Sequence, residues 1–575
     1  MSPRVRPALD RIMNRAASKK HFKPIGPRHR RERFVKAIGA GLAGLCVFST
    51  AQAATTWYVS PNGADANAGT SWASAKQTAQ AAVNAATNGD TVLVSDGVYF
   101  LTSPVKITSA IELTSLNGSS ATILDGQQAG RCVTVDGAAA TVNGFTLRNG
   151  RAVVGGGAYC NGGAIRNCIL TNNQAIGSDL NDGKGGGVYV TYGSLSNCLV
   201  MYNVAKSTNS YQAAWGGGVY CYGSVVRDCV VSNNLCSSAD SANGGGVVLV
   251  GGELRKSRVA GNSAIALSYA SGGGIYADIM QLSVASFIEA CLVASNSVTT
   301  TDTYAYTAAL ASGGGMYIGN GTTVRSTLVI RNTARAFAGF TSGGGVRSSG
   351  SVLENCTIAY NDVASYYGHL GAGGGWDPIV LNDLGAGGGV MWGYNDRCYN
   401  NIIKFNSANN DPDNGDVNSL SYPTFINSDI GPWFGVFAPA INTLNGTTAD
   451  PLFVNAAGGD FRLQSGSPCR NAGTNLAWMT SALDLDSNNR LVDGIVDIGA
   501  FEVWSQPQLI IIRSGANFIL TWPTNPAGAT LQSTTNLVSP PVWGNATDTF
   551  QTNGGSISIV LPLTDAEKFY RLVKL

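Results

Sequence analysis

GGGVYCYGSVVRDCVVSNNLC, residues 216–236, is one unit of a repeat that runs from Gly155 to Ala408. Each unit opens with a glycine triplet that is followed by an apolar residue. An aliphatic-x-x-Asn signature comes later in the unit, and a small apolar residue stands two places after its asparagine. Eight units keep this spacing, so chance does not explain it. The eight asparagines are Asn173, Asn203, Asn234, Asn262, Asn296, Asn332, Asn361 and Asn406.

This repeat predicts a solenoid of stacked β-coils. Each unit has short β-rich runs, and no window shows apolar residues at helical spacing over three turns. Such a unit cannot bury its own apolar face, but copies stacked on one another can. Equivalent residues then lie one above another, about 4.8 Å apart. We expect the asparagines to form a structural ladder at an inward turn, each amide bonding the next coil, and we expect right-handed crossovers.

The motif G-G-G-V-Y followed by N-C-x-[ILV]-x-x-N resembles the repeats of right-handed parallel β-helix proteins of the pectate-lyase-like superfamily. It is also similar to repeats of polymorphic outer-membrane proteins. The resemblance covers residues 57–502 and implies an all-β, single-stranded parallel β-helix with an N-terminal capping helix. We place that helix at Ala75–Ala86, which is alanine-rich and amphipathic. The resemblance is specific for the fold alone, because such scaffolds carry lyases, hydrolases, adhesins and structural proteins.

Residues 1–53 are predicted to be a cleavable signal peptide. Twelve basic residues precede the short apolar run Ala37–Ser49, and Ala51-Gln52-Ala53 is a small-x-small cleavage site. The apolar run is too short to span a membrane, so no transmembrane segment is expected in the exported chain. The sequence therefore predicts a secreted protein or one on the outer cell surface.

The rest of the chain divides by composition. We expect a β-helix over residues 54–502, then a linker at 503–508 and an antiparallel β-sandwich at 509–575, where apolar and polar residues alternate. Within the β-helix we distinguish the N-terminal cap and first coils (54–150), the glycine-triplet repeats (151–408), and the last coils with a closing motif (409–502).

Charge limits the partners of the exported chain. The whole chain has 37 basic and 35 acidic residues, and the first 53 residues hold 12 of the former and two of the latter. The remainder has 25 basic and 33 acidic residues, a net charge of −8. An acidic protein of this kind is not expected to bind nucleic acid. We expect a monomer.

Cysteines and carboxylates give little sign of a metal site. Most cysteines of the repeat, such as Cys198, occupy one axial slot, so we expect buried free thiols rather than disulfide bonds. No C-x-x-C pair exists, and the exported chain has a single histidine, so we expect no zinc site. The run Asp484–Asn488 has the oxygen spacing of a calcium loop, but the glycine and glutamate that should follow are missing. We interpret it as a polar turn and expect no cofactor.

No catalytic residue can be named. Acidic residues between Arg151 and Lys404 are sparse and do not recur at a common slot. The motifs of polygalacturonase-like enzymes are missing, and His369 is interpreted as a loop residue. A lyase would need carboxylates around a calcium ion beside an arginine or lysine, and a hydrolase would need two carboxylates at a fixed distance.

Tyrosines form the most distinctive pattern. They fill the slot after the apolar residue that follows the glycine triplet, and strand alternation predicts that this slot faces outward. Stacked tyrosines beside Ser- and Thr-rich segments suit sugar rings. The alternative is a packing ladder that only stabilises neighbouring strands. The candidate carbohydrate-binding residues are Tyr159, Tyr189, Tyr220, Tyr276 and Tyr317, and the column is interrupted by Val248.

Two functions stay open on the sequence. The first is a non-enzymatic surface or extracellular protein that binds a polysaccharide, a cell-surface glycan or another surface. The second is a polysaccharide lyase or glycoside hydrolase of the pectate-lyase-like group, and only this alternative allows calcium. The feature that discriminates between them is a cluster of carboxylates beside arginine or lysine in a groove.

Overall fold

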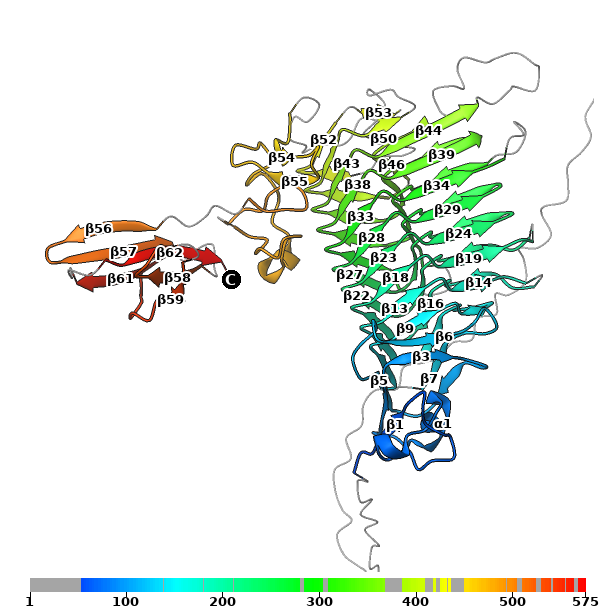
Figure 1. The fold of residues 1–575 in the computed structure, drawn as a ribbon. Coiled ribbons are helices and arrows are strands. Elements are labelled where there is room, and N and C mark those ends of the chain that lie inside the picture. Colours follow the sequence, from blue (N-terminus) through cyan, green and yellow to red (C-terminus); the bar gives the residue numbers. More distant parts are fainter. Residues whose placement is uncertain are drawn as a thin grey trace, which may run out of the picture. The chain divides into compact units, whose positions relative to one another are not determined.

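The chain folds as a right-handed, single-stranded parallel β-helix and a small antiparallel β-sandwich (Figure 1). The computed structural model describes residues 53–503 and 509–574, apart from 138, 179, 210, 280–283, 303–308, 368–384, 394, 409–416, 420–423, 432, 436–448, 493, 524–528, 539–540, 554 and 563–566. The predicted signal peptide therefore lies outside the described residues except for Ala53. None of the described helices is long and apolar enough to cross a membrane.

One coil shows how the repeat folds. β16 (Val188–Thr191) follows the glycine triplet, and tight turns connect it to β17 (Ser194–Ser196) and β18 (Leu199–Met201). β19 (Val204–Ser207) comes after the asparagine, and β20 (Ala214–Trp215) leads to the next triplet. Each strand pairs in parallel with its equivalent in the next coil. Residues at equivalent positions of successive repeats are therefore paired with each other in the sheets.

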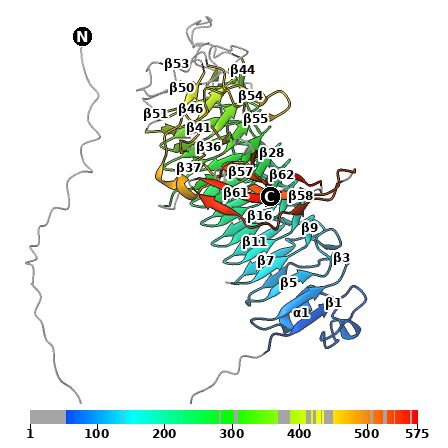
Figure 2. The same ribbon diagram turned by 90° about the vertical axis from the view of Figure 1, so that its left-hand side faces the viewer.

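The coils build five parallel sheets, which we name A to E. Among the described residues, sheet A contains β17 and has 13 strands, while sheets B and C contain β18 and β16 and have 12 each. Sheet D contains β19 and has nine strands, and sheet E contains β20 and has seven. Figure 2 shows sheet C as a continuous stack that includes β7 (Val133–Asp136), β11 (Ala158–Asn161) and β16.

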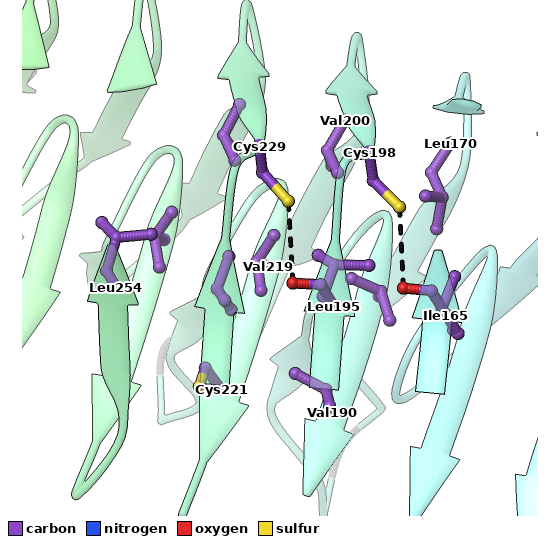
Figure 3. Close-up of a cluster of buried hydrophobic side chains, with 14 of the residues drawn as sticks. Ile165, Leu170, Val190, Leu195, Cys198, Val200, Val219, Cys221, Cys229 and Leu254 are labelled. Atoms are coloured by element: carbon purple, nitrogen blue, oxygen red, sulfur yellow. Dashed lines mark hydrogen bonds between the residues drawn. The ribbon is translucent and has the colours of Figure 1, made fainter. Parts of the chain in front are cut away.

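Two separate cores hold these sheets together. Sheets A, B and C enclose an aliphatic core into which Val190, Leu195 and Val200 point (Figure 3). The inner face of the wing formed by sheets D and E is lined mostly by alanines such as Ala205 and Ala242. Since these side chains are small, the two sheets of the wing lie close together.

The glycine triplet makes the sharp corner between the wing and sheet C. Gly216 has φ of +65°, a region that L-residues with a side chain rarely adopt. A Cβ on the next residue, Gly217, would lie 2.3 Å from the carbonyl oxygen of Gly245 in the coil above. Both positions therefore require glycine, which explains why the triplet recurs in every unit.

The cysteines of the repeat are buried free thiols, as the sequence predicts. All eleven cysteines of the described chain are buried and unbridged. The Sγ atoms of Cys198 and Cys229 lie 3.7 Å from the carbonyl oxygens of Ile165 and Leu195, toward which the thiols donate (Figure 3). They fill the core at the corner between sheets A and B as small apolar groups.

The asparagine ladder lies at the corner between sheets B and D. The side chain of Asn234 is almost fully buried, and its Nδ2 donates to the carbonyl oxygen of Val200 and to Oδ1 of Asn262, both at 2.9 Å. Its Oδ1 accepts bonds of 3.0 Å from both the backbone N and Nδ2 of Asn203. Every hydrogen-bonding group of the amide is thus used, and the same pattern recurs along the ladder.

The first coil is closed by a helix, which is shorter than the sequence predicts. α1 spans Ala79–Ala85, and the hydroxyl of Thr78 accepts a bond from the backbone N of Ala81 at its start. Residues 75–78 are not helical, because Ala75 is extended and ends the 3-10 turn Trp72–Ser74. The helix contacts β1 (Thr56–Val59) and covers the open end of the core.

The last part of the β-helix differs from a simple continuation of coils. β50 (Val417–Ser419) and β53 (Trp433–Gly435) extend sheet C. By contrast, β54 (Phe453–Asn455) and β55 (Asp460–Leu463) pair with each other in antiparallel fashion. Together with the residues up to 503, they pack on the outer face of sheet B, and we name residues 450–503 the covering segment.

A buried arginine fixes the covering segment to the coils. Arg490 is fully buried, and its guanidinium donates to Ser326 Oγ at 3.0 Å and to the carbonyl oxygen of Asn355 at 3.4 Å. It also forms an ion pair of 2.7 Å with Glu502, whose side chain is equally buried. Burial raises the pKa of Glu502, and the neighbouring Arg490 opposes that rise.

The C-terminal sandwich consists of two small antiparallel sheets. One contains β57 (Asn517–Pro523) paired with β61 (Ser556–Pro562), and the other contains β58 (Ala529–Thr534) paired with β62 (Phe569–Lys574). Its core comprises Leu520, Trp522, Leu531, Ala546 and Ile559. The predicted linker, residues 503–508, lies outside the described residues except for Val503.

Replacing Asn234 by Ala tests the structural role of the ladder. The change removes the acceptor of the backbone N and of one Nδ2 donor of Asn203, and the donor to Val200 O and Asn262 Oδ1, in a dry corner, so unfolding should become easier by about 1–3 kcal/mol. Urea unfolding followed by circular dichroism measures the loss. Asn233→Gly is the matched control, because Asn233 is exposed and its φ of +54° suits glycine. Equal midpoints for Asn234→Ala and the control would contradict the prediction.

Candidate functional site

The predicted tyrosine column lies on the outer face of sheet C. Tyr189 and Tyr220 stand in register on neighbouring strands, and their rings are stacked, with centroids 4.8 Å apart and planes 5° apart. Tyr159 stacks on Tyr189 at 5.6 Å. Tyr276 and Tyr317 form a second stack at 4.9 Å. The column thus runs along the solenoid, one ring per coil, in two parts.

The gap between the two parts is filled rather than open. Val248 occupies the tyrosine slot there and is fully buried. Trp215 of sheet E packs against this cluster, and its ring meets that of Tyr276 edge-on at 5.6 Å. Tyr220 keeps only 6% of its surface exposed, while the other tyrosines of the column are half-buried. The column therefore occupies the concave corner between sheet C and the wing.

Cations stand beside the column. The guanidinium carbon of Arg131 lies 5.4 Å from the ring centre of Tyr159, and Nζ of Lys184 lies 5.8 Å from that of Tyr220. Asp182 accepts a 3.1 Å bond from the indole Nε1 of Trp215 and pairs with Lys184 at 3.4 Å. These contacts hold the aromatic groups of the corner in one arrangement.

This geometry changes how the tyrosines can meet a sugar. In a stack at 4.8 Å the faces of Tyr189 and Tyr220 cover each other, so a sugar ring cannot lie on them. Only ring edges and hydroxyl groups are left for a ligand. Burial also raises the pKa of the Tyr189 hydroxyl to about 12. The structure thus shows the tyrosines as a packing ladder, which is one of the two alternatives that the sequence leaves open. Binding of a sugar to the tyrosine hydroxyl groups stays a prediction.

A cleft lies elsewhere, between the corner of sheets A and B and the covering segment. Its volume is about 670 Å³, which is within the range of ligand sites. The coils contribute the turn Lys256–Arg258 together with Glu289 and Leu292. The covering segment contributes residues 459–462 and 481–487. The two walls are about 200 residues apart in the sequence.

The charged groups of the cleft fall into two kinds. Arg462 is neutralised by Asp486, with Nε–Oδ2 and Nη2–Oδ1 distances of 2.5 and 3.0 Å, and by Asp460 at 3.3 Å. Lys256 and Arg258 are exposed, and no acidic side chain of the described residues pairs with either. These two cations are the ones available to a ligand.

The carboxylates of the cleft are engaged in the fold. Glu289 pairs with Arg255. Asp484 is buried, and its carboxylate accepts bonds from the backbone N of Asp486, Asn488 and Glu502. The run Asp484–Asn488 is thus the polar turn that the sequence predicts. Within the described residues, no three His, Cys, Asp and Glu side chains gather as a metal site.

No local pattern in the sequence marks this cleft, because residues 409–502 are predicted to form the last coils, whereas β54, β55 and the residues after them pack on the outer face of sheet B. A single residue does depart from local preference. Lys256 stands at a turn position with φ of +46°, where the two preceding coils carry Asn197 and Asp228 and the next coil carries Ala290. A lysine is unusual in that conformation, since it lacks the short polar side chain that favours it. His369 lies outside the described residues.

The fold defines a right-handed parallel β-helix repeat protein. No protein-family model and no curated protein sequence matches the chain. Among solved structures it is similar to pectate lyase Pel9A, with 15% identity, a TM-score of 0.40, and coverage of 78% of this chain and 96% of that one. A rhamnogalacturonan lyase matches with 13% identity, a TM-score of 0.31, and coverage of 70% and 90%.

A third similar structure is a tailspike protein of E. coli bacteriophage HK620, with 12% identity, a TM-score of 0.27, and coverage of 90% of this chain and 84% of that one. At such identities the likeness concerns the fold alone.

The raised pKa of Tyr189 predicts a loss of stability in alkali. An unfolded tyrosine ionises near pH 10, whereas Tyr189 ionises near pH 12 in the folded chain. Its contribution is complete below pH 10 and is lost as pH rises from 10 through 12. Urea midpoints measured from pH 8 to 12 should fall less steeply for Tyr189→Phe than for the wild type. Tyr211→Phe, which changes a ring that is 87% exposed, should keep the wild-type slope; equal slopes for all three proteins would refute the prediction.

Proposed function

We propose that this protein is secreted or displayed on the cell surface and binds glycan without catalysis. The observation that carries the proposal is the cleft between the corner of sheets A and B and the covering segment, with Lys256 and Arg258 exposed in its wall. Its ligand would be an extended chain, because the cleft wall spans three successive coils, in which Arg258, Leu292 and Leu328 stand in register. The predicted signal peptide supports export.

The chemistry of the cleft supports a ligand rich in oxygen. Lys and Arg side chains are donors only, so the groups that meet Lys256 and Arg258 are acceptors such as hydroxyl or carboxylate oxygens. Leu292 and Leu328 add an apolar strip to the same wall. Sugars offer both kinds of surface, since their rings have C–H faces and hydroxyl rims.

The second candidate is a polysaccharide lyase or glycoside hydrolase, with calcium under the lyase mechanism. One observation favours it: the covering segment brings Asp460, Asp484 and Asp486 close to Lys256 and Arg258 in one cleft. This is the cluster that discriminates between the two functions. However, Asp484 accepts the hydrogen bonds of its own turn, and Asp460 and Asp486 both pair with Arg462, so none of the three carboxylates is free to hold a metal or activate water. The engaged carboxylates support binding over catalysis.

Removing the two free cations tests the proposal. Lys256→Asn suits the left-handed turn, and Arg258→Gln keeps the length of the side chain. The double variant should bind its polysaccharide at least tenfold more weakly, because charge-assisted hydrogen bonds to the ligand are lost. Affinity electrophoresis in gels that contain polygalacturonate, alginate or a neutral glucan measures the effect. Arg227→Gln is the matched control, since it removes an exposed arginine one coil away that does not line the cleft.

The same gels separate the alternatives. Wild-type retention without any fall in polymer length supports binding, whereas shortened chains would establish an enzyme. Tyr159→Phe with Tyr189→Phe removes hydroxyl groups from the tyrosine column without disturbing its stack. Loss of retention in that variant and not in the Lys256/Arg258 variant would move the binding site to the corner with the wing.

A further inference from the structure

A second column of asparagines lies outside the core, at the corner between sheets A and B. Asn167 and Asn197 directly follow strands of sheet A, have φ of +55° and +50°, and are exposed. Asn143 stands in the coil below, at the position of Arg166 and so one residue before that of Asn167. The Nδ2 of Asn197 donates to Oδ1 of Asn167, and the Nδ2 of Asn167 donates to Oδ1 of Asn143, both at 2.7 Å. We name these three residues the outer asparagine column.

This column has hydrogen-bonding capacity to spare. An asparagine amide has two N–H donors and an oxygen that accepts two bonds. Asn167 and Asn197 each donate once within the described structure, and Oδ1 of Asn197 accepts no bond there. By contrast, buried ladder residues such as Asn203 use both donors and accept two bonds. The asparagine amides thus use all of their hydrogen-bonding groups at the corner between sheets B and D, but only some of them at the corner between sheets A and B.

The spare groups face a groove. The outer asparagine column lines a hollow of about 470 Å³, whose other walls include Thr114, Ser119, Ile169 and Leu199. The two aliphatic side chains are half-buried on sheet B beside the amides. An amide N–H next to an amide oxygen matches a hydroxyl group, which both donates and accepts, and the aliphatic side chains match C–H surface.

The groove is electrically neutral. The residues that line it carry no formal charge. Arg166, just before the column, is paired with Glu112 at 2.8 Å, and Arg227 in the next coil is paired with Asp228 at 3.2 Å. No free cation is therefore available here to favour an anionic ligand, in contrast to the cleft with Lys256 and Arg258.

We propose that the groove of the outer asparagine column is a binding subsite for a neutral, hydroxyl-rich polymer, namely an uncharged stretch of glycan lying along the solenoid. The proposal rests on the proposed glycan-binding function and adds a place and a ligand class to it. Asn167 and Asn197 stand at equivalent positions of neighbouring coils, about 4.8 Å apart, so a chain that runs parallel to the axis meets the same donor and acceptor twice.

The test removes the amides without straining the turns. In Asn167→Gly with Asn197→Gly the backbone keeps its positive φ, because glycine adopts it readily. Affinity electrophoresis with galactomannan, xyloglucan and mixed-linkage β-glucan should show retention of the wild type by a neutral polymer. The double variant should bind that polymer about tenfold more weakly, through the loss of two or more hydrogen bonds.

Asn172→Gly with Asn233→Gly is the matched control. These residues are also exposed and have φ of +54°, but they lie at the corner between sheets B and D, outside the groove. The control should keep both its urea midpoint and its affinity. Each single variant, Asn167→Gly and Asn197→Gly, provides a milder change with a smaller loss of affinity.

Two results would overturn the inference: no retention by any of the neutral polymers, or unchanged affinity in the double glycine variant. If Lys256→Asn with Arg258→Gln abolishes retention of a glycan that the glycine variant still binds, the proposed function stands and the groove fails as a subsite. If no glycan, neutral or acidic, is retained by the wild type, both fail together.

Discussion

The buried amide ladder at the corner between sheets B and D is the constraint on which the β-helix depends. Each asparagine bonds the backbone and side chain of its neighbours, so every coil must turn at the same residue and at the same height. A coil one residue longer between its axial slot and its asparagine would leave two amides unpaired in a dry core. This explains why the segments outside the ladder vary in length while the distance from the axial slot to the asparagine does not.

The wing follows from the same constraint. The ladder fixes where each coil leaves sheet B, and the glycine triplet fixes where it enters sheet C. The number of residues between these two points can therefore vary from coil to coil, and these residues form the wing. Alanines such as Ala205 and Ala242 let the strands of sheets D and E pack closely, so the wing is a second, two-layered structure beside the main core. The tyrosine column then lies in the corner that the wing makes with sheet C, and Trp215 of the wing helps to bury it.

Much of this could be predicted from the sequence, since the repeat carries the strands, the ladder and the axial thiols at fixed spacing. The stacking of Tyr189 on Tyr220 also follows from their register. Its consequence, that the ring faces cover each other, depends on side-chain rotamers that spacing does not determine. The place of the covering segment could not be predicted, because Arg490 meets Ser326 across 164 residues and no local pattern marks that pairing. The cleft depends on that long-range contact.

The two candidate surfaces at the corner of sheets A and B differ in their relation to the repeat. At Asn167 and Asn197 two neighbouring coils carry the same residue, so one amide is repeated at equivalent positions. At Lys256, Ser257 and Arg258 the pattern is broken, since serine replaces the axial cysteine and lysine occupies a strained turn. Departures from local preference that persist in a stable fold are expected where a protein has a function to serve. A polymer that followed this corner would therefore meet the amides of Asn167 and Asn197 first and the charged site of Lys256 and Arg258 beyond them, so the amides would supply affinity and the charged site would supply selectivity.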